Sequence, residues 1–152
     1  MQPVPAVKTL GKTFTAADLR SLDAPTALAL RWHALAQTIP VREDRYIALW
    51  VSLEALAGGP GTDLLKRIWE LFVQAVGREE ADAARPGFDL RALRDLRNRL
   101  VAGTAREQAP TIVEYAVSDR SVALVDALVA DTLRSRLGIE AEKSLAKRLV
   151  ES

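Results

Sequence analysis

The residues best suited to chemistry are an arginine and an asparagine near the end of an amphipathic helical pattern. Arg97 and Asn98 precede Gly103, which ends the pattern. A guanidinium group can hold a phosphate through two parallel hydrogen bonds. Asn98 and Ala102 are four residues apart and share one helix face, whereas Arg97 lies about 140° around the helix from position 102. Alanine can neither accept nor donate a proton, so this face offers phosphate binding without an evident acid or base.

The surrounding stretch is rich in arginine, although the net charge of the whole chain is only +1. A stretch of this kind can contact phosphates, but it can equally be a solvated helix face. Arg99 also follows Asp95 by four residues, which is the spacing of an intrahelical ion pair, so we interpret Arg99 as more structural than catalytic. Six arginines lie between residues 85 and 106: Arg85, Arg91, Arg94, Arg97, Arg99 and Arg106.

Composition limits the classes of protein that the chain can belong to. Its 152 residues, 49% of them hydrophobic and 27% charged, suffice for one globular domain with a core. There is no cysteine and a single histidine, so we predict neither a disulfide framework nor a metal site, and no cofactor. The chain has no apolar run long enough to cross a bilayer and no secretory signal pattern at its start, which predicts a cytoplasmic protein.

The hydrophobic periodicity is helical almost throughout, so we expect an all-α bundle of about six helices. We expect residues 1–14 to be loosely held and residues 15–152 to form a single domain. Residues 78–87 should form a loop with a helical turn, and residues 111–115 are the one possible strand. The helices are expected to begin near Thr15, Asp23, Val41, Thr62, Asp89 and Ser118, and a last one to cover residues 139–150.

Two segments, residues 45–56 and 95–103, resemble the HEPN family of small helical domains, and most closely its Apea-like subgroup. The first is similar to the family's aromatic-rich helix with an internal glutamate, here Glu54. The second is similar to the family's signature of an arginine, often followed by a polar residue, and a histidine after four to six residues. Arg97 and Asn98 match this signature, and Ala102 occupies the histidine position. The resemblance covers roughly residues 27–140 and implies a HEPN-like helical bundle.

The resemblance implies metal-independent RNA cleavage, in which the ribose 2′-hydroxyl attacks the adjacent phosphate. A histidine would move the proton, and the arginine would hold the phosphate and offset its developing charge. It also implies a homodimer with two motifs in one cleft, a setting in toxin–antitoxin pairs or antiviral defence, and an antitoxin or larger defence protein as partner. Arg94, Arg97 and Arg99 would contact RNA. Glu54 would orient Arg97, or it is a surface acid on a helix whose other face is buried.

Alanine at position 102 predicts that this copy is catalytically dead or very weak. Either a histidine was replaced deliberately, which we favour, or the chain is a natural pseudo-enzyme. The alternative function is a non-catalytic helical module that binds RNA or a partner protein within a larger defence protein. A third possibility is a purely structural helical dimer, in which loss of the Arg97 side chain would have no functional effect.

The remaining residues with chemical potential are interpreted as structural. His33 could replace the missing base, but its apolar surroundings favour a packed histidine. Trp32, Trp50 and Trp69 lie at helical core spacing, which argues against stacking on bases. The glycine-rich segment 58–61 lacks the lysine and hydroxyl residue of a phosphate-binding loop.

Overall fold

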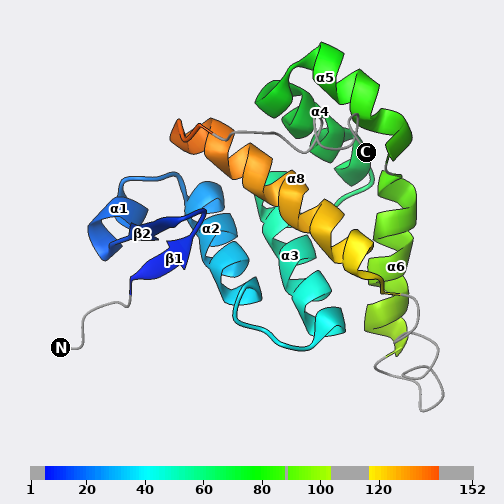
Figure 1. Cartoon of the computed structure of the whole chain (residues 1–152), viewed down its shortest axis with the longest axis horizontal. Coiled ribbons are helices and arrows are strands. Elements are labelled where there is room, and N and C mark those ends of the chain that lie inside the picture. The colour runs from blue at the N-terminus through cyan, green and yellow to red at the C-terminus, as the bar shows by residue number, and fades with distance from the viewer. Residues whose placement is uncertain (1–5, 88, 104–116, 141–152) are drawn as a thin grey trace.

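The computed structural model describes residues 6–87, 89–103 and 117–140, with the backbone alone at residues 102 and 103. Within these ranges the chain forms a helical bundle, as the periodicity predicted. It has seven α-helices where about six were expected, together with one 3₁₀ turn and a small hairpin (Figure 1). The elements are β1 (Val7–Thr9), β2 (Lys12–Phe14), α1 (Ala16–Arg20), α2 (Ala24–Ala36), α3 (Arg42–Leu56), α4 (Leu64–Val76), α5 (Arg78–Ala84), η1 (Arg85–Gly87), α6 (Leu90–Gly103) and α8 (Asp119–Leu137).

Local hydrogen bonds explain where most of the helices begin. Thr15 and Asp18 form a capping box at α1, in which each side chain accepts from the other residue's backbone N–H. The carboxylate of Asp23 caps α2 and the hydroxyl of Ser118 caps α8. Asp89 accepts from two backbone N–H groups at the start of α6. These four starts are the predicted ones.

The start of α4 differs from the prediction. Thr62 was expected to cap this helix, but the helix begins at Leu64 and its N-cap is Asp63. The Asp63 carboxylate makes no capping bond and instead accepts from Arg67 Nε at 3.1 Å. Arg67 also donates to the carbonyls of Ala57 and Gly59, so this arginine ties the glycine-rich turn to α4.

The core is built around α3, which packs against α2, α4, α6 and α8. In Figure 1, α8 crosses in front of α3, α2 lies on one side of it and α6 on the other. Polar bonds also join these helices. Ser52 Oγ donates to the Ala29 carbonyl of α2 at 2.6 Å, and Tyr46 Oη donates to the Leu93 carbonyl of α6 at 2.6 Å. The largest fully buried side chains include Leu30, Tyr46, Leu49, Trp50, Leu53, Ile68, Phe72, Leu128 and Leu133.

Two segments have more regular structure than the sequence suggested. Residues 78–84 form α5 rather than a loop, because Ala81 and Ala84, three residues apart, are both fully buried. Residues 7–14 were expected to be part of a loosely held segment, but they form an antiparallel hairpin in which Val7 is opposite Phe14. Its turn residues, Leu10 and Gly11, have φ angles of 56° and 72°, a combination that suits a two-residue hairpin turn.

Several expectations lie outside the described residues. These are the first five residues, the possible strand at 111–115, and the last helix beyond residue 140. Among the helices that the structure describes, none combines the length and apolar character required to cross a membrane.

The hydrogen bond between α3 and α6 can be tested with Tyr46→Phe. We expect this variant to lower the free energy of unfolding by about 1–2 kcal/mol in urea denaturation at pH 7, because a buried hydrogen bond is lost with little change in packing. Burial raises the pKa of Tyr46, so its contribution to stability is complete below the unfolded pKa of about 10 and is lost as the pH rises further. The gap between wild type and variant should therefore narrow above pH 10. A gap that is independent of pH would contradict this explanation.

Candidate functional site

The structure brings together three of the residues predicted from the sequence motif: Glu54, Arg97 and Asn98. Arg97 Nη1 donates to Asn98 Oδ1 at 3.1 Å, and Arg97 Nη2 lies 4.0 Å from Glu54 Oε1. Glu54 is near the end of α3 and Arg97 is in the second half of α6, 43 residues later. We call Glu54, Arg97 and Asn98 the arginine site.

Glu54 is held in place from within its own helix. Trp50 is fully buried, and its indole Nε1–H donates to Glu54 Oε1 at 2.8 Å. This bond spans one helical turn and fixes the carboxylate at the edge of the core, where the Glu54 side chain is only 16% exposed. The Tyr46–Leu93 bond, two turns earlier in α3, sets the position of α6 beside it. The glutamate therefore faces Arg97 because two buried aromatic residues of α3 position both partners.

The arginine site leaves hydrogen-bonding capacity for a ligand. A guanidinium carries five N–H donors, and Asn98 Oδ1 is the one hydrogen-bond acceptor for the guanidinium group of Arg97 among the residues that the structure describes. The Glu54 contact, at 4.0 Å, is at the outer limit of an ion pair. With a side chain 33% exposed, Arg97 can reach solvent while Glu54 holds its guanidinium group. A phosphate could therefore bind without displacing either partner.

The other predicted RNA-contacting arginines are arranged differently. Arg94 lies one turn before Arg97 on the same side of α6, and its Nη2 is 3.7 Å from Asp95 Oδ1. The predicted ion pair between Asp95 and Arg99 is wrong, since no such contact occurs in the described part of α6. Arg99 is exposed and follows Arg97 by two residues, about 200° around the helix, so it lies on the opposite side.

Position 102 is within the last turn of α6. The methyl group of Ala102 supplies no proton donor or acceptor, whatever its surroundings. The arginine site can thus bind an anion, but the motif lacks the residue that would transfer a proton.

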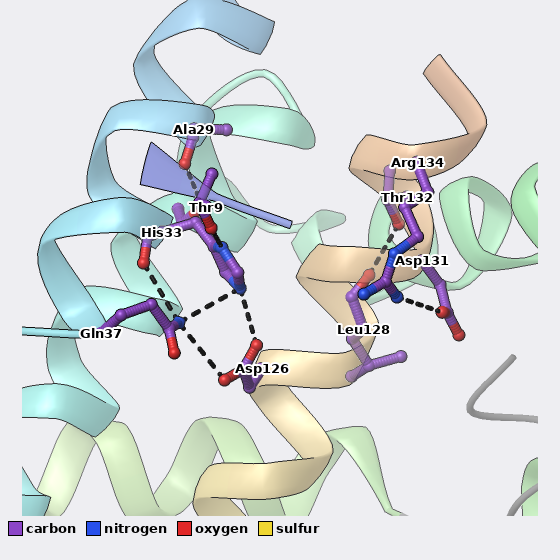
Figure 2. Close-up of polar contacts among 10 residues, drawn as sticks. Thr9, Ala29, His33, Gln37, Asp126, Leu128, Asp131, Thr132 and Arg134 are labelled. Atoms are coloured by element: carbon purple, nitrogen blue, oxygen red, sulfur yellow. Dashed lines mark hydrogen bonds and ion pairs between the residues drawn. The ribbon is translucent and has the colours of Figure 1, made fainter. Parts of the chain in front are cut away.

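His33 is the centre of a separate polar network that joins the hairpin to two helices. The network is buried at Thr9 and His33 and reaches the surface at Asp126 and Gln37. Its Nδ1 lies 2.5 Å from Thr9 Oγ1, and its Nε2 lies 2.6 Å from Asp126 Oδ1 (Figure 2). Gln37, one turn after His33, donates from Nε2 to Asp126 Oδ2 at 3.3 Å. These contacts come from β1, α2 and α8.

A hydroxyl, an imidazole and a carboxylate in this order also form the constellation of nucleophilic catalysis. Here the hydroxyl is not accessible to a substrate, because Thr9 is 6% and His33 4% exposed. Neither of the two pockets described below is lined by these residues. The prediction of a packed histidine is therefore confirmed. Burial is the largest single influence and acts to raise the pKa of Asp126. The hydrogen bond and charge of His33, together with smaller contributions from Gln37 and Arg134, outweigh it and lower the pKa below its ordinary value.

The tryptophans divide into one core residue and two pocket residues. Trp50 is fully buried, as predicted. Trp32 and Trp69 are only partly buried, and each lines a pocket. The pocket beside Trp32 has a volume of about 650 Å³ and is largely apolar, with Leu28 and Leu35 on its wall. The pocket beside Trp69 is bordered by several charged residues. Helical spacing alone could not distinguish these residues from core residues, because all three follow the same apolar pattern.

Comparisons with known proteins provide no family assignment. No family model, no curated protein and no solved structure matches the chain. The resemblance to the HEPN family therefore stays a prediction that depends on the motif residues and on their arrangement in the helical bundle.

The His33 network can be tested with Asp126→Asn. We expect this variant to lower the free energy of unfolding by about 1 kcal/mol at pH 7, because a hydrogen bond to a charged group becomes a neutral one. Since the folded-state pKa of Asp126 is lowered, its contribution to stability is present above its unfolded pKa of about 4 and is lost as the pH falls further. The difference in urea midpoint between variant and wild type should therefore shrink toward pH 3.

The matched control is Asp82→Asn, which removes a carboxylate that is exposed on α5. It should change the unfolding free energy by less than about 0.5 kcal/mol. An equal effect of the two substitutions would show that general charge, rather than the contact with His33, determines the result.

Proposed function

We propose that this protein is a HEPN-type RNA-binding domain with the architecture of a metal-independent endoribonuclease, and that the present chain does not cleave efficiently. The observation that carries the proposal is the contact between Glu54 and Arg97, on two helices that the motif requires to be adjacent. Their proximity supports the proposal because Glu54 and Arg97 are the glutamate and arginine of the two motif segments, and they meet although they are 43 residues apart.

In this proposal, each residue of the arginine site has a defined role. Arg97 binds a phosphate of the RNA backbone, and Glu54 and Asn98 keep its guanidinium group oriented. Cleavage would transfer the 2′-hydroxyl proton to a base and return a proton to the leaving 5′-oxygen. Ala102 cannot perform either step. The site would therefore bind RNA and leave the phosphodiester bond intact.

A second copy of the chain would complete the site, as in the family. This part of the proposal follows from the resemblance to the family. An antitoxin or a larger defence protein remains a proposed partner. If Ala102 is natural, the same features support the alternative function of a non-catalytic RNA-binding or dimerisation module.

The role of Arg97 in binding can be tested with Arg97→Ala and a single-stranded RNA. We expect binding to weaken about tenfold, because a charge-assisted contact to phosphate is lost. The slope of log Kd against log salt concentration should fall by about 0.7 for each phosphate contact removed. Fluorescence anisotropy at several salt concentrations measures both quantities.

Arg99→Ala is the matched control. Arg99 was grouped with the RNA-contacting arginines from the sequence, but it lies on the side of α6 opposite Arg97, so the proposed site does not include it. This variant should leave the affinity for RNA within about twofold of wild type at about 0.15 M salt, because a charge on the far side of the helix is largely screened there. Equal weakening by the two substitutions would contradict the proposed site.

Catalytic competence can be tested with Ala102→His. We expect this variant to gain metal-independent RNA cleavage, with a rate about 10²–10⁴-fold above that of the alanine protein, because a general acid–base group is restored. The assay is RNA cleavage in excess EDTA, together with growth of cells that express the variant. The control is the double variant with Arg97→Ala, which should lose most of this gain. A folded Ala102→His protein that neither cleaves RNA nor slows growth would overturn the nuclease architecture.

A further inference from the structure

A cationic pocket, separate from the arginine site, lies where α4, η1 and the start of α6 meet. It has a volume of about 730 Å³, which is sufficient for a small ligand. Lys66 and Trp69 contribute from α4, Arg85 from η1, and Leu90 and Arg91 from α6. We call the pocket that these residues line the Trp69 pocket.

An arginine lies over an aromatic ring on the wall of this pocket. The Arg85 guanidinium carbon is 4.9 Å from the centroid of the Trp69 ring. Trp69 in turn packs against Phe72, which is 1% exposed, with ring centroids 6.0 Å apart. The tryptophan is thus anchored in the core and holds the exposed guanidinium above it. A guanidinium held in this way provides a flat surface on which a nucleobase can stack.

The segment that carries Arg85 is fixed at its other end. Arg120, near the start of α8, donates from Nη2 to the Gly87 carbonyl at 3.1 Å. This bond ties η1 to the bundle. Among the described residues, the cation–π contact is the one interaction that the Arg85 guanidinium makes. Its five N–H donors are therefore available to a ligand in the pocket.

The charges that line the pocket favour an anion. Three cationic residues, Lys66, Arg85 and Arg91, face one acidic residue, Asp89. The Asp89 carboxylate already accepts the backbone N–H groups of Arg91 and Ala92, so the α6 N-terminus partly offsets its charge. A phosphate can therefore approach Lys66 and Arg91.

The pocket and the arginine site lie along the same side of α6. Leu90 and Arg97 are seven residues apart, almost two full turns, so they point in nearly the same direction about 10 Å apart along the axis. Arg94 lies between them on that side. A chain of phosphates bound at Arg97 would therefore continue past Arg94 toward the pocket.

We propose that the Trp69 pocket binds one nucleotide of a single-stranded RNA, with the base on Arg85 and the phosphate at Lys66 and Arg91. The inference deepens the proposed function and rests on it for the choice of RNA. It assigns Trp69, which sequence spacing placed in the core, to the support of a base-stacking surface. The stacking surface distinguishes the pocket from a purely electrostatic site, since stacking selects for a base and charge does not.

The test compares AMP with ribose 5-phosphate, which carries the same phosphate without a base. We expect the wild-type protein to bind AMP about tenfold more tightly than ribose 5-phosphate, because the stacked base adds to the binding free energy. NMR titration measures both Kd values from the Trp69 indole resonance. The variant Arg85→Lys retains the charge and loses the planar group, so it should bind both ligands with nearly equal affinity. Equal affinities of the wild-type protein for AMP and ribose 5-phosphate would overturn the proposal. In a competition experiment, RNA should displace AMP from the pocket, and an acidic peptide that displaces AMP equally well would also overturn it.

Two controls separate this inference from the proposed function. Arg31→Ala removes an exposed arginine beside Trp32 in the other pocket, and it should leave AMP binding unchanged. Arg97→Ala should weaken RNA binding and leave AMP binding unchanged. If AMP binds as expected but Arg97→Ala has no effect on RNA binding, the arginine site fails and the Trp69 pocket stands. If the protein shows no preference for AMP over ribose 5-phosphate but Arg97→Ala weakens RNA binding, the proposal for the Trp69 pocket is wrong and the proposal for the arginine site is retained.

Discussion

The hydrogen bond from Tyr46 to the Leu93 carbonyl is the interaction on which the arrangement of α3 and α6 depends. In a regular α-helix, the carbonyl of Leu93 also accepts the backbone N–H of Arg97. Its two lone pairs can serve both donors. The same peptide group therefore joins the buried core of α3 to the residue that carries the cationic side chain. Because Trp50 and Glu54 follow Tyr46 on successive turns of α3, one helix face supplies the anchor, the indole donor and the carboxylate.

Much of the fold could be predicted from the sequence, because its signals are local. A hydroxyl or carboxylate at Thr15, Asp23, Asp89 and Ser118 marks a helix start by bonding to N–H groups within three residues. Arg97, Asn98 and Glu54 could be named from a motif, but their contact could not be derived. It depends on the packing of α6 against α3, and no local rule specifies which helices become neighbours.

The features that sequence reasoning missed all depend on tertiary contacts. The hairpin is short and gains its stability from β1 packing on α2, where Thr9 meets His33. In the segment that forms α5, the charged residues between the alanines hid the apolar periodicity of the helix, although Ala81 and Ala84 are buried. Trp69 follows the same periodicity as Trp50, but η1 ends beside it and leaves its outer edge in a pocket. Periodicity identifies the inward face of a helix without indicating how far its neighbours extend over that face.

The single histidine of the chain has a consequence for how the assembly of the bundle can be followed. His33 is bonded to residues 24 positions before it and 93 positions after it, so its ring contacts both β1 and α8. Since no other imidazole is present, the proton and nitrogen resonances of this ring form a unique spectroscopic signal. Loss of the Thr9 contact would alter the Nδ1 environment, and loss of the Asp126 contact would alter that of Nε2. One side chain therefore reports separately on the attachment of the first element and of the last element that the structure describes.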